Sequence, residues 1–154
     1  QRGGKRIYSH SANVGTVKLY DACGRDKSAL SAYIRGAIAE YGGVRANGLA
    51  MYAIGGTATT MASVSLGLPV YDPSKTDGFT ITLNEAKSLA DKILSLSVEQ
   101  VKAMPGMEPR RADLIGGGCL LMCEVMEMLG IDRITVSEKD NLEGYVLSKL
   151  DHES

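Results

Sequence analysis

The sequence of 154 residues contains no tryptophan, one phenylalanine, two histidines and three cysteines. Cys23, Cys119 and Cys123 do not have the spacing of a disulfide framework, and we find neither a signal peptide nor a long uninterrupted apolar span. We therefore expect a protein of the reducing cytoplasm that has no membrane partner. The histidines, His10 and His152, stand at opposite ends of the sequence with no nucleophile arrangement beside them, which argues against a catalytic triad.

An excess of charge of either sign is also missing. The 17 basic and 18 acidic residues give a formal net charge of -1, so no overall field attracts nucleic acid, and an anionic ligand must be held by local groups. The length and the 44% apolar content suffice for one domain with a hydrophobic core. Because the sequence starts with Gln1 and a turn-like Arg2-Gly3-Gly4, we expect it to begin inside a longer protein.

Hydrophobic periodicity predicts strands that alternate with helices. The first half predicts an extended segment at Lys5 to Tyr20 and a helix from Asp26 to Gly42-Gly43. A strand at Leu49 to Ile54 follows, and a glycine turn then leads into a helix that runs to about Leu66. After it we expect a loop at Pro69 to Asp77 and a brief strand at Phe79 to Thr82. The second half predicts two helices, which begin at the capping boxes Thr82 to Glu85 and Ser97 to Gln100. A buried helix at Arg111 to Leu129 follows and ends at Gly130. The last predicted elements are a strand at Ile131 to Ser137 and a closing helix at Leu142 to Leu150. This order is typical of a layered α/β domain.

The predicted buried helix carries two features that need a structural reason. Its three consecutive glycines, Gly116 to Gly118, each cost roughly 1 kcal/mol of helix stability relative to alanine, so we expect a close approach of a neighbouring segment or a ligand. Cys119 and Cys123 stand four residues apart and could share a metal ion, but no histidine or further cysteine is near. We expect both thiols to pack in the core.

The clearest local signal for chemistry is the run Ile54-Gly55-Gly56-Thr57-Ala58-Thr59-Thr60. Glycines let a backbone approach a ligand, amides point outward from a helix N-terminus, and threonine hydroxyls can donate to phosphate oxygens. Gly55, Gly56, Thr57 and Thr59 are therefore candidate phosphate contacts. The run lacks the lysine of a P-loop, and a tight strand-to-helix connection with threonine caps explains the same residues equally well.

Two further groups of polar residues are candidates. Arg110 and Arg111 precede the buried helix and have the fork geometry that suits phosphate, although an exposed helix cap is the simpler explanation. Ser137, Glu138 and Glu143-Gly144 lie at and after the end of the last predicted strand, where open α/β sheets place ligand groups. Solvated loop residues are the simpler explanation of this group.

Several segments together resemble one family. The segments are Ser11 to Leu19, Ile54 to Ala62, Leu66 to Asp72, Gly78 to Leu83, Met104 to Asp113, and Val136 through Gly144, in this order. They resemble the exopolyphosphatase and guanosine pentaphosphate phosphohydrolase family, the Ppx/GppA phosphatases, and the resemblance runs nearly end to end. The sequence departs from the family at Asp140, Asn141 and Leu142, where the family usually has glycine, leucine and arginine.

The resemblance implies an α/β fold of the ribonuclease-H-like kind found in the actin, sugar-kinase and acetate-kinase superfamily. It implies that residues 1–154 form a single partial domain, the back half of the second domain of a longer phosphatase, which lacks the first two strands of that domain. The family's catalytic glutamate and its acidic triple-glycine turn do not appear in this sequence.

The implied reaction removes the terminal phosphate from inorganic polyphosphate or pppGpp with the help of Mg²⁺. The resemblance places the catalytic residues and the metal ligands outside this sequence, so we expect the isolated chain to be inactive. Gly55, Gly56, Thr57 and Thr59 become the first candidates for ligand contacts, and Arg110 and Arg111 the second.

Two other functions fit the same residues. The chain could be a non-catalytic module that binds a nucleotide or phosphate at its glycine turn. It could also be a structural fragment that self-associates, because absent strands leave unpaired sheet edges. In either case the partners would be upstream domains, a second copy of the chain, or both.

Overall fold

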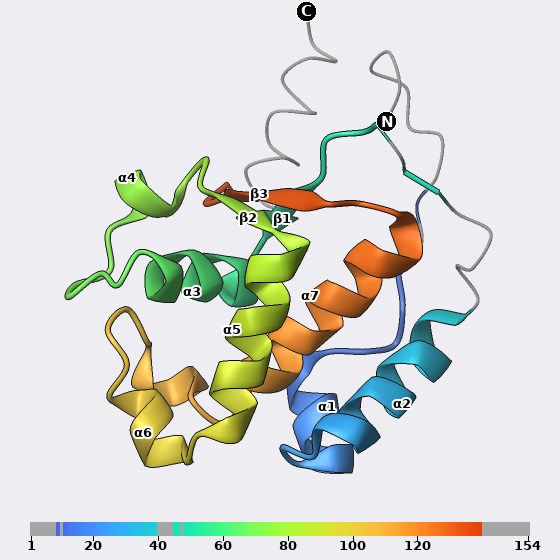
Figure 1. The fold of residues 1–154 in the computed structure, drawn as a ribbon, viewed down its shortest axis with the longest axis horizontal. Helices are drawn as coiled ribbons and strands as arrows, with labels where there is room; N and C mark the ends of the chain where they lie inside the picture. Colours follow the sequence, from blue (N-terminus) through green and yellow to red (C-terminus); the bar gives the residue numbers. More distant parts are fainter. Residues whose placement is uncertain (1–8, 10, 40–44, 47, 140–154) are drawn as a thin grey trace, which may run out of the picture.

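The structure is a computed structural model that describes residues 9, 11–39, 45–46 and 48–139. In chain order these form α1 (Thr16–Cys23), α2 (Lys27–Ile38), β1 (Tyr52–Ile54), α3 (Gly56–Ser65), α4 (Pro73–Thr76), β2 (Thr80–Thr82), α5 (Leu83–Ser95), α6 (Val98–Lys102), the 3-10 helix η2 (Pro109–Arg111), α7 (Ile115–Leu129) and β3 (Arg133–Ser137) (Figure 1). The predicted closing helix, Leu142 to Leu150, lies outside the described residues.

The three strands form one sheet in the order β1-β3-β2. β3 pairs in parallel with β1 and antiparallel with β2. α3 packs on β1 and β3, α5 packs on β2, and α7 packs against both helices, on the same side of the sheet (Figure 1). Side chains alternate as this layering requires, since Ala53 is buried toward the helices while Tyr52 and Ile54 are exposed. The predicted α/β layering is therefore confirmed.

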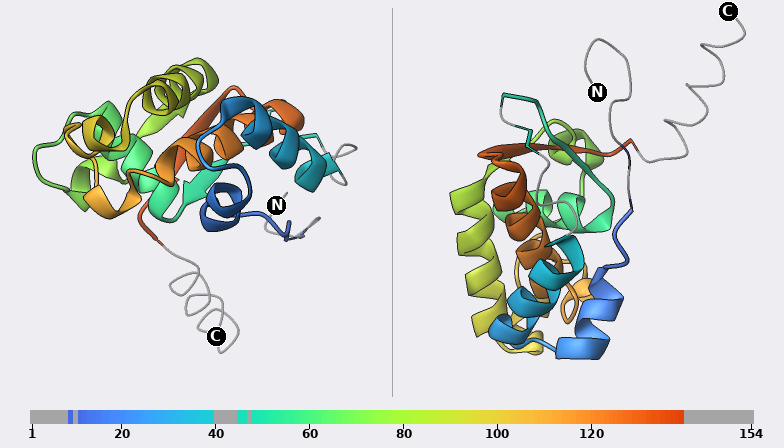
Figure 2. Two further views of the ribbon diagram at one scale, coloured as in Figure 1. Left: turned by 90° about the horizontal axis from the view of Figure 1, so that it is seen from below. Right: turned by 90° about the vertical axis from the view of Figure 1, so that its right-hand side faces the viewer.

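The core has two parts that share α7. The larger part lies between the sheet and α3, α5 and α7. The smaller part forms where α1 and α2 pack beside α7 (Figure 2), and its buried residues are Leu19, Leu30, Ile34, Ile38 and Leu120. Cys119 and Cys123 are buried in the larger part, and burial raises the pKa of both thiols, that of Cys123 to about 11. The expectation that both cysteines pack in the core is confirmed.

The three glycines of α7 have a packing explanation. A methyl group on Gly116 would lie 2.5 Å from the side chain of Leu94 in α5, and one on Gly118 would lie 2.9 Å from the side chains of Thr16 and Thr57. Gly117 faces Leu30, at 3.4 Å from the same hypothetical methyl group. Neighbouring helices therefore approach α7 closely on several sides, and this packing outweighs the low helix propensity of glycine.

The predicted extended segment at Lys5 to Tyr20 is wrong where it overlaps α1, and residues 9 and 11–15 also form no strand. Its β-branched residues favour a strand, but Thr16, Leu19 and Cys23 recur at helical spacing. Leu19 is fully buried against α2 and α7, so tertiary packing decides the conformation. The segment before residue 9 lies outside the described residues.

Most of the predicted helix boundaries hold. Both capping boxes form, at Thr82 with Glu85 and at Ser97 with Gln100, and Gly130 ends α7 in the left-handed conformation at φ 71°. The buried helix itself begins at Ile115, four residues later than predicted, because η2 precedes it.

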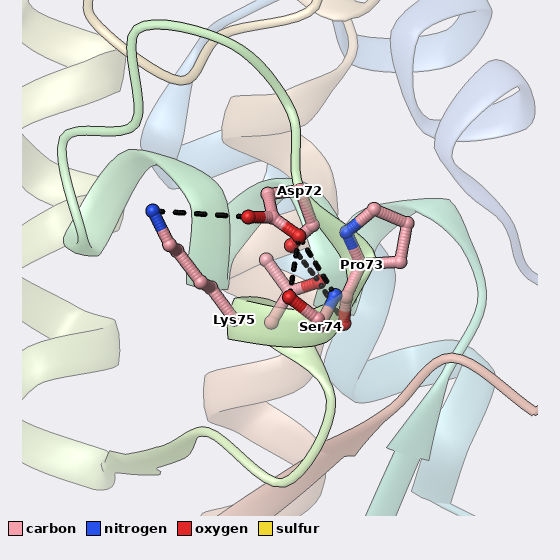
Figure 3. Close-up of polar contacts among 5 residues, drawn as sticks. Asp72, Pro73, Ser74 and Lys75 are labelled. Carbon is pink, nitrogen blue, oxygen red and sulfur yellow. Dashed lines mark hydrogen bonds and ion pairs between the residues drawn. The ribbon is translucent and has the colours of Figure 1, made fainter.

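The predicted loop from Pro69 to Asp77 contains the short helix α4. Asp72 caps this helix by accepting hydrogen bonds from the backbone nitrogen and the hydroxyl of Ser74, at 3.0 and 2.7 Å (Figure 3). Pro73 occupies the first turn, where its missing N–H costs nothing. The predicted loop therefore contains a capped helical turn between α3 and β2.

Candidate functional site

Two parallel strands end at the same edge of the sheet. Ile54, the last residue of β1, is in register with Ser137, the last residue of β3. The glycine turn therefore begins beside the carboxyl end of the central strand. In open α/β sheets this is the edge where ligands bind.

The glycine turn has the conformation that only glycine adopts readily. Gly55 has φ 87° and ψ 173°, is exposed, and serves as the N-cap of α3. Its carbonyl accepts the first helical hydrogen bond, from the backbone nitrogen of Thr59 at 3.2 Å. The amides of Gly56, Thr57 and Ala58 precede that bond and have no partner within the helix. The turn therefore presents backbone donors at the positive end of a helix dipole.

Arg111 lies directly against this turn. A methyl group built on Gly56 would overlap the guanidinium of Arg111, including its Cζ and both Nη atoms. The Nε of the same guanidinium donates to the carboxylate of Glu108 at 2.5 Å. This hydrogen bond and the neighbouring positive charge lower the pKa of Glu108. The fold thus joins two of the predicted site residues, which are 55 positions apart in the sequence.

The other predicted site residues are placed differently. Thr59 is half-buried and lines the same cleft as Arg111. The side chain of Thr57 points toward Gly118 of α7, so only its backbone amide is turned to the site. Arg110 is exposed and does not line the cleft.

The cleft itself has a volume of about 430 Å³. It opens between the first turn of α3, the connection from α3 to α4, and the segment that leads into η2. Its walls are Thr59, Thr60, Leu68, Pro69, Tyr71, Gly106, Met107, Glu108, Pro109 and Arg111. A larger groove, of about 680 Å³, runs along α5 and includes none of the predicted site residues. Of the predicted site residues, Thr59 and Arg111 line the smaller cleft, while Gly55, Gly56 and Thr57 are not among its walls. Because Arg111 also lies against Gly56, the smaller cleft is the better candidate.

A polar cluster at the end of β3 was not expected from the sequence. The hydroxyl of Tyr71 donates to the carboxylate of Glu138, with oxygen distances of 2.6 and 2.7 Å, and the hydroxyl of Thr76 donates to the same carboxylate. The backbone nitrogen of Glu138 donates to Asp77 at 2.9 Å. Burial and the bond to Glu138 raise the pKa of Tyr71. Glu138, a candidate from its place after the last strand, is therefore an anchored residue and not a solvated one, but the sequence did not indicate its partners Tyr71 and Thr76.

These groups suit the binding of an anion. Backbone amides and the Arg111 guanidinium are hydrogen-bond donors that favour phosphate oxygens. The Thr59 hydroxyl is a further donor, which in this structure makes a long hydrogen bond of 3.5 Å to the carbonyl of Gly56. Within the described residues no group of three or more His, Cys, Asp and Glu side chains could hold a metal ion. No helix of the described chain is both long and apolar enough to cross a membrane.

Solved structures show the same fold. A Ppx/GppA family member from Aquifex aeolicus superposes with a TM-score of 0.80 at 24% identity, over 92% of this chain and 48% of that protein. An exopolyphosphatase from Cytophaga hutchinsonii superposes with a TM-score of 0.76 at 18% identity, over 97% of this chain and 51% of that protein. The chain thus has the actin-like fold of these proteins and spans about half of their length.

Sequence comparisons agree with the structural ones. Exopolyphosphatase 2 of Mycobacterium tuberculosis is 32% identical over 99 residues, which is 62% of this chain and 31% of that protein. A bifunctional 3-dehydroquinate synthase/phosphatase of Fusobacterium nucleatum is 28% identical over 153 residues, which is 92% of this chain and 23% of that protein. The sequence model of the Ppx/GppA phosphatase family matches residues 3–153. The chain therefore belongs to the Ppx/GppA phosphatase family.

Proposed function

We propose that this chain forms one wall of a cytoplasmic active site that removes the terminal phosphate from inorganic polyphosphate or pppGpp. The observation that carries the proposal is the position of the Arg111 guanidinium, which lies against Gly56 at the open N-terminus of α3. Family membership gives the class of reaction, and this arrangement gives the chain a part in it.

The part we assign to the chain is electrostatic. Phosphoryl transfer depends largely on positioning the phosphate and stabilising the charge on its oxygens. The amides of Gly55, Gly56 and Thr57, the Thr59 hydroxyl and the Arg111 guanidinium would bind those oxygens. Arg110 is an exposed neighbour in η2 and would add long-range positive charge.

A divalent cation such as Mg²⁺ would offset the charge of the phosphates. The described residues of this chain do not offer a donor set for such an ion. We infer that the ligands of the cation and the group that activates water belong to another part of the protein. The isolated chain would then bind its ligand weakly and not turn it over.

The sheet supports the need for a further segment. Among the described residues β1 pairs only with β3, so no described strand covers its other edge. The exposed Tyr52 and Ile54 project from the same strand. A free edge is a template for another strand. We propose that residues 1–154 form a partial domain, and that its partner is either an upstream segment of the same protein or a second copy of the chain.

The test is a chimera in which this chain replaces the part of the Aquifex aeolicus protein that it covers. We expect the chimera to release phosphate from polyphosphate or pppGpp with Mg²⁺, and Arg111→Ala to impair it. The isolated chain should release none. Phosphate release by the isolated chain would contradict the proposal that the cation ligands and the group that activates water belong to another part of the protein. A chimera that unfolds cooperatively but releases no phosphate would contradict the proposed reaction. If this chain still bound tripolyphosphate in that case, the result would favour a non-catalytic binding module.

A further inference from the structure

The position of Arg111 depends on one neighbour. Its side chain is about two-fifths exposed, at 41%, and an arginine this exposed ordinarily samples many rotamers. Here its Nε donates to Glu108, three residues earlier in the chain. Within the described residues the bond leaves both Nη atoms without a hydrogen-bond partner and places them over Gly56.

Glu108 carries a negative charge in a cleft that we propose binds an anion. It lines the same cleft as Thr59 and Arg111, and its pKa is lowered, so it is ionised at neutral pH. A carboxylate repels a phosphate at close range, and on charge alone it should weaken the binding of an anion. Its presence in the cleft therefore needs a compensating role.

We propose that Glu108 is a positioning residue, which holds the Arg111 guanidinium flat against Gly56 so that its two Nη groups face the ligand. The inference rests on the proposed phosphate site. An arginine that is already oriented loses less conformational entropy when it binds, because fewer rotamers are given up. This geometry gives the acidic residue a role beside an anion site.

The proposed positioning role and simple charge repulsion predict changes of opposite sign in the Kd for an anion when Glu108 is removed. Removing Glu108 releases Arg111 and should weaken binding of an anion, whereas removing a negative charge alone should tighten it. An exposed ion pair of this kind contributes little to folding, so a structural role cannot account for a large loss. The sign of the change in Kd is therefore the deciding observation.

The experiment titrates the 154-residue chain with tripolyphosphate and follows the amide signals of Gly55, Gly56 and Thr59 by NMR. We expect Glu108→Ala to raise the Kd roughly tenfold. Glu108→Gln, which keeps an acceptor for Nε, should retain most of the affinity. In the Arg111→Ala background, Glu108→Ala should not weaken binding further. Glu99→Ala, which removes an exposed carboxylate from α6, is the matched control for charge.

The outcomes separate the two proposals. If tripolyphosphate binds and Arg111→Ala weakens it, but Glu108→Ala leaves the Kd unchanged or lowers it, the positioning role is overturned and the phosphate site stands. An equal loss from Glu108→Ala with and without Arg111 also overturns it. If the wild-type chain shows no shift at the glycine turn, the phosphate site fails and Glu108 loses its role as well. Urea unfolding of each variant should show an unchanged midpoint.

Discussion

Replacing Gly56 with alanine separates the two roles that a glycine can have at this position. Gly56 is the first residue of α3 and does not have a positive φ, so an alanine fits the backbone there. The added methyl group would instead displace the guanidinium of Arg111. The substitution therefore moves a side chain that is distant in sequence and leaves the turn intact.

The expected change in stability is small. Alanine is favoured over glycine in a helix by up to about 1 kcal/mol. Loss of the exposed ion pair between Arg111 and Glu108 removes less than about 1 kcal/mol. Because the two contributions oppose each other, we expect the free energy of unfolding, measured in urea, to change by less than about 1 kcal/mol.

The expected change in binding is large. A hydrogen bond to a charged group contributes about 1.5 to 3 kcal/mol. Since about 1.4 kcal/mol corresponds to a tenfold change in Kd, displacement of Arg111 should weaken tripolyphosphate binding roughly 10- to 150-fold. Calorimetry or NMR titration measures this directly. In the Arg111→Ala background, Gly56→Ala should have less than about a twofold effect, because the two residues act as one unit.

The matched control is Gly36→Ala. Gly36 lies inside α2, where a methyl group would have no atom within 4 Å, so this variant should gain helix stability and bind like the wild type. The reasoning is refuted if Gly56→Ala binds tripolyphosphate as the wild type does. It is also refuted if Gly56→Ala weakens binding by the same factor with and without Arg111.

Two further predictions concern stability. Gly118→Ala should destabilise the fold by about 1 to 3 kcal/mol in urea unfolding, although alanine is the better helix former, because its methyl group would meet Thr16 and Thr57 at 2.9 Å; a gain in stability would contradict the packing of α7. Burial and the hydrogen bond to Glu138 raise the pKa of Tyr71 above 10.0, so the folded state favours the neutral phenol. This preference adds to the free energy of unfolding below pH 10, and the added stability is lost as the pH rises through the folded pKa. Tyr71→Phe should therefore reduce the loss of stability above pH 10, and an unchanged alkaline profile would contradict the cluster.

The local elements of the fold were predictable from the sequence because their signals are local. The capping boxes at Thr82 and Ser97 join residues three positions apart, and Gly130 ends a helix through its own backbone. The extended segment before Tyr20 was predicted wrongly because the deciding contact, between Leu19 and the helices α2 and α7, is distant in sequence.

The candidate site was predictable only in part for the same reason. The composition of the run from Gly55 to Thr59 indicates a turn that a phosphate could approach. Nothing in the sequence places Arg111 on Gly56 or ties Glu138 to Tyr71. The first contact depends on how η2 packs against the start of α3, and the second on how the connection between α3 and α4 meets the end of β3. Periodicity predicts which face of an element is buried, and it does not predict which residue of another element meets it.

The central claim is that the N-terminus of α3 and the Arg111 guanidinium together bind a phosphate group. The most direct measurement is a map of chemical-shift changes in the ¹⁵N-labelled chain as tripolyphosphate is added. We predict saturable shifts at the amides of Gly55, Gly56, Thr57 and Thr59 and at the Nε of Arg111, with the groove along α5 unchanged. Saturable shifts confined to that groove, or none at the glycine turn up to millimolar tripolyphosphate, would contradict the account.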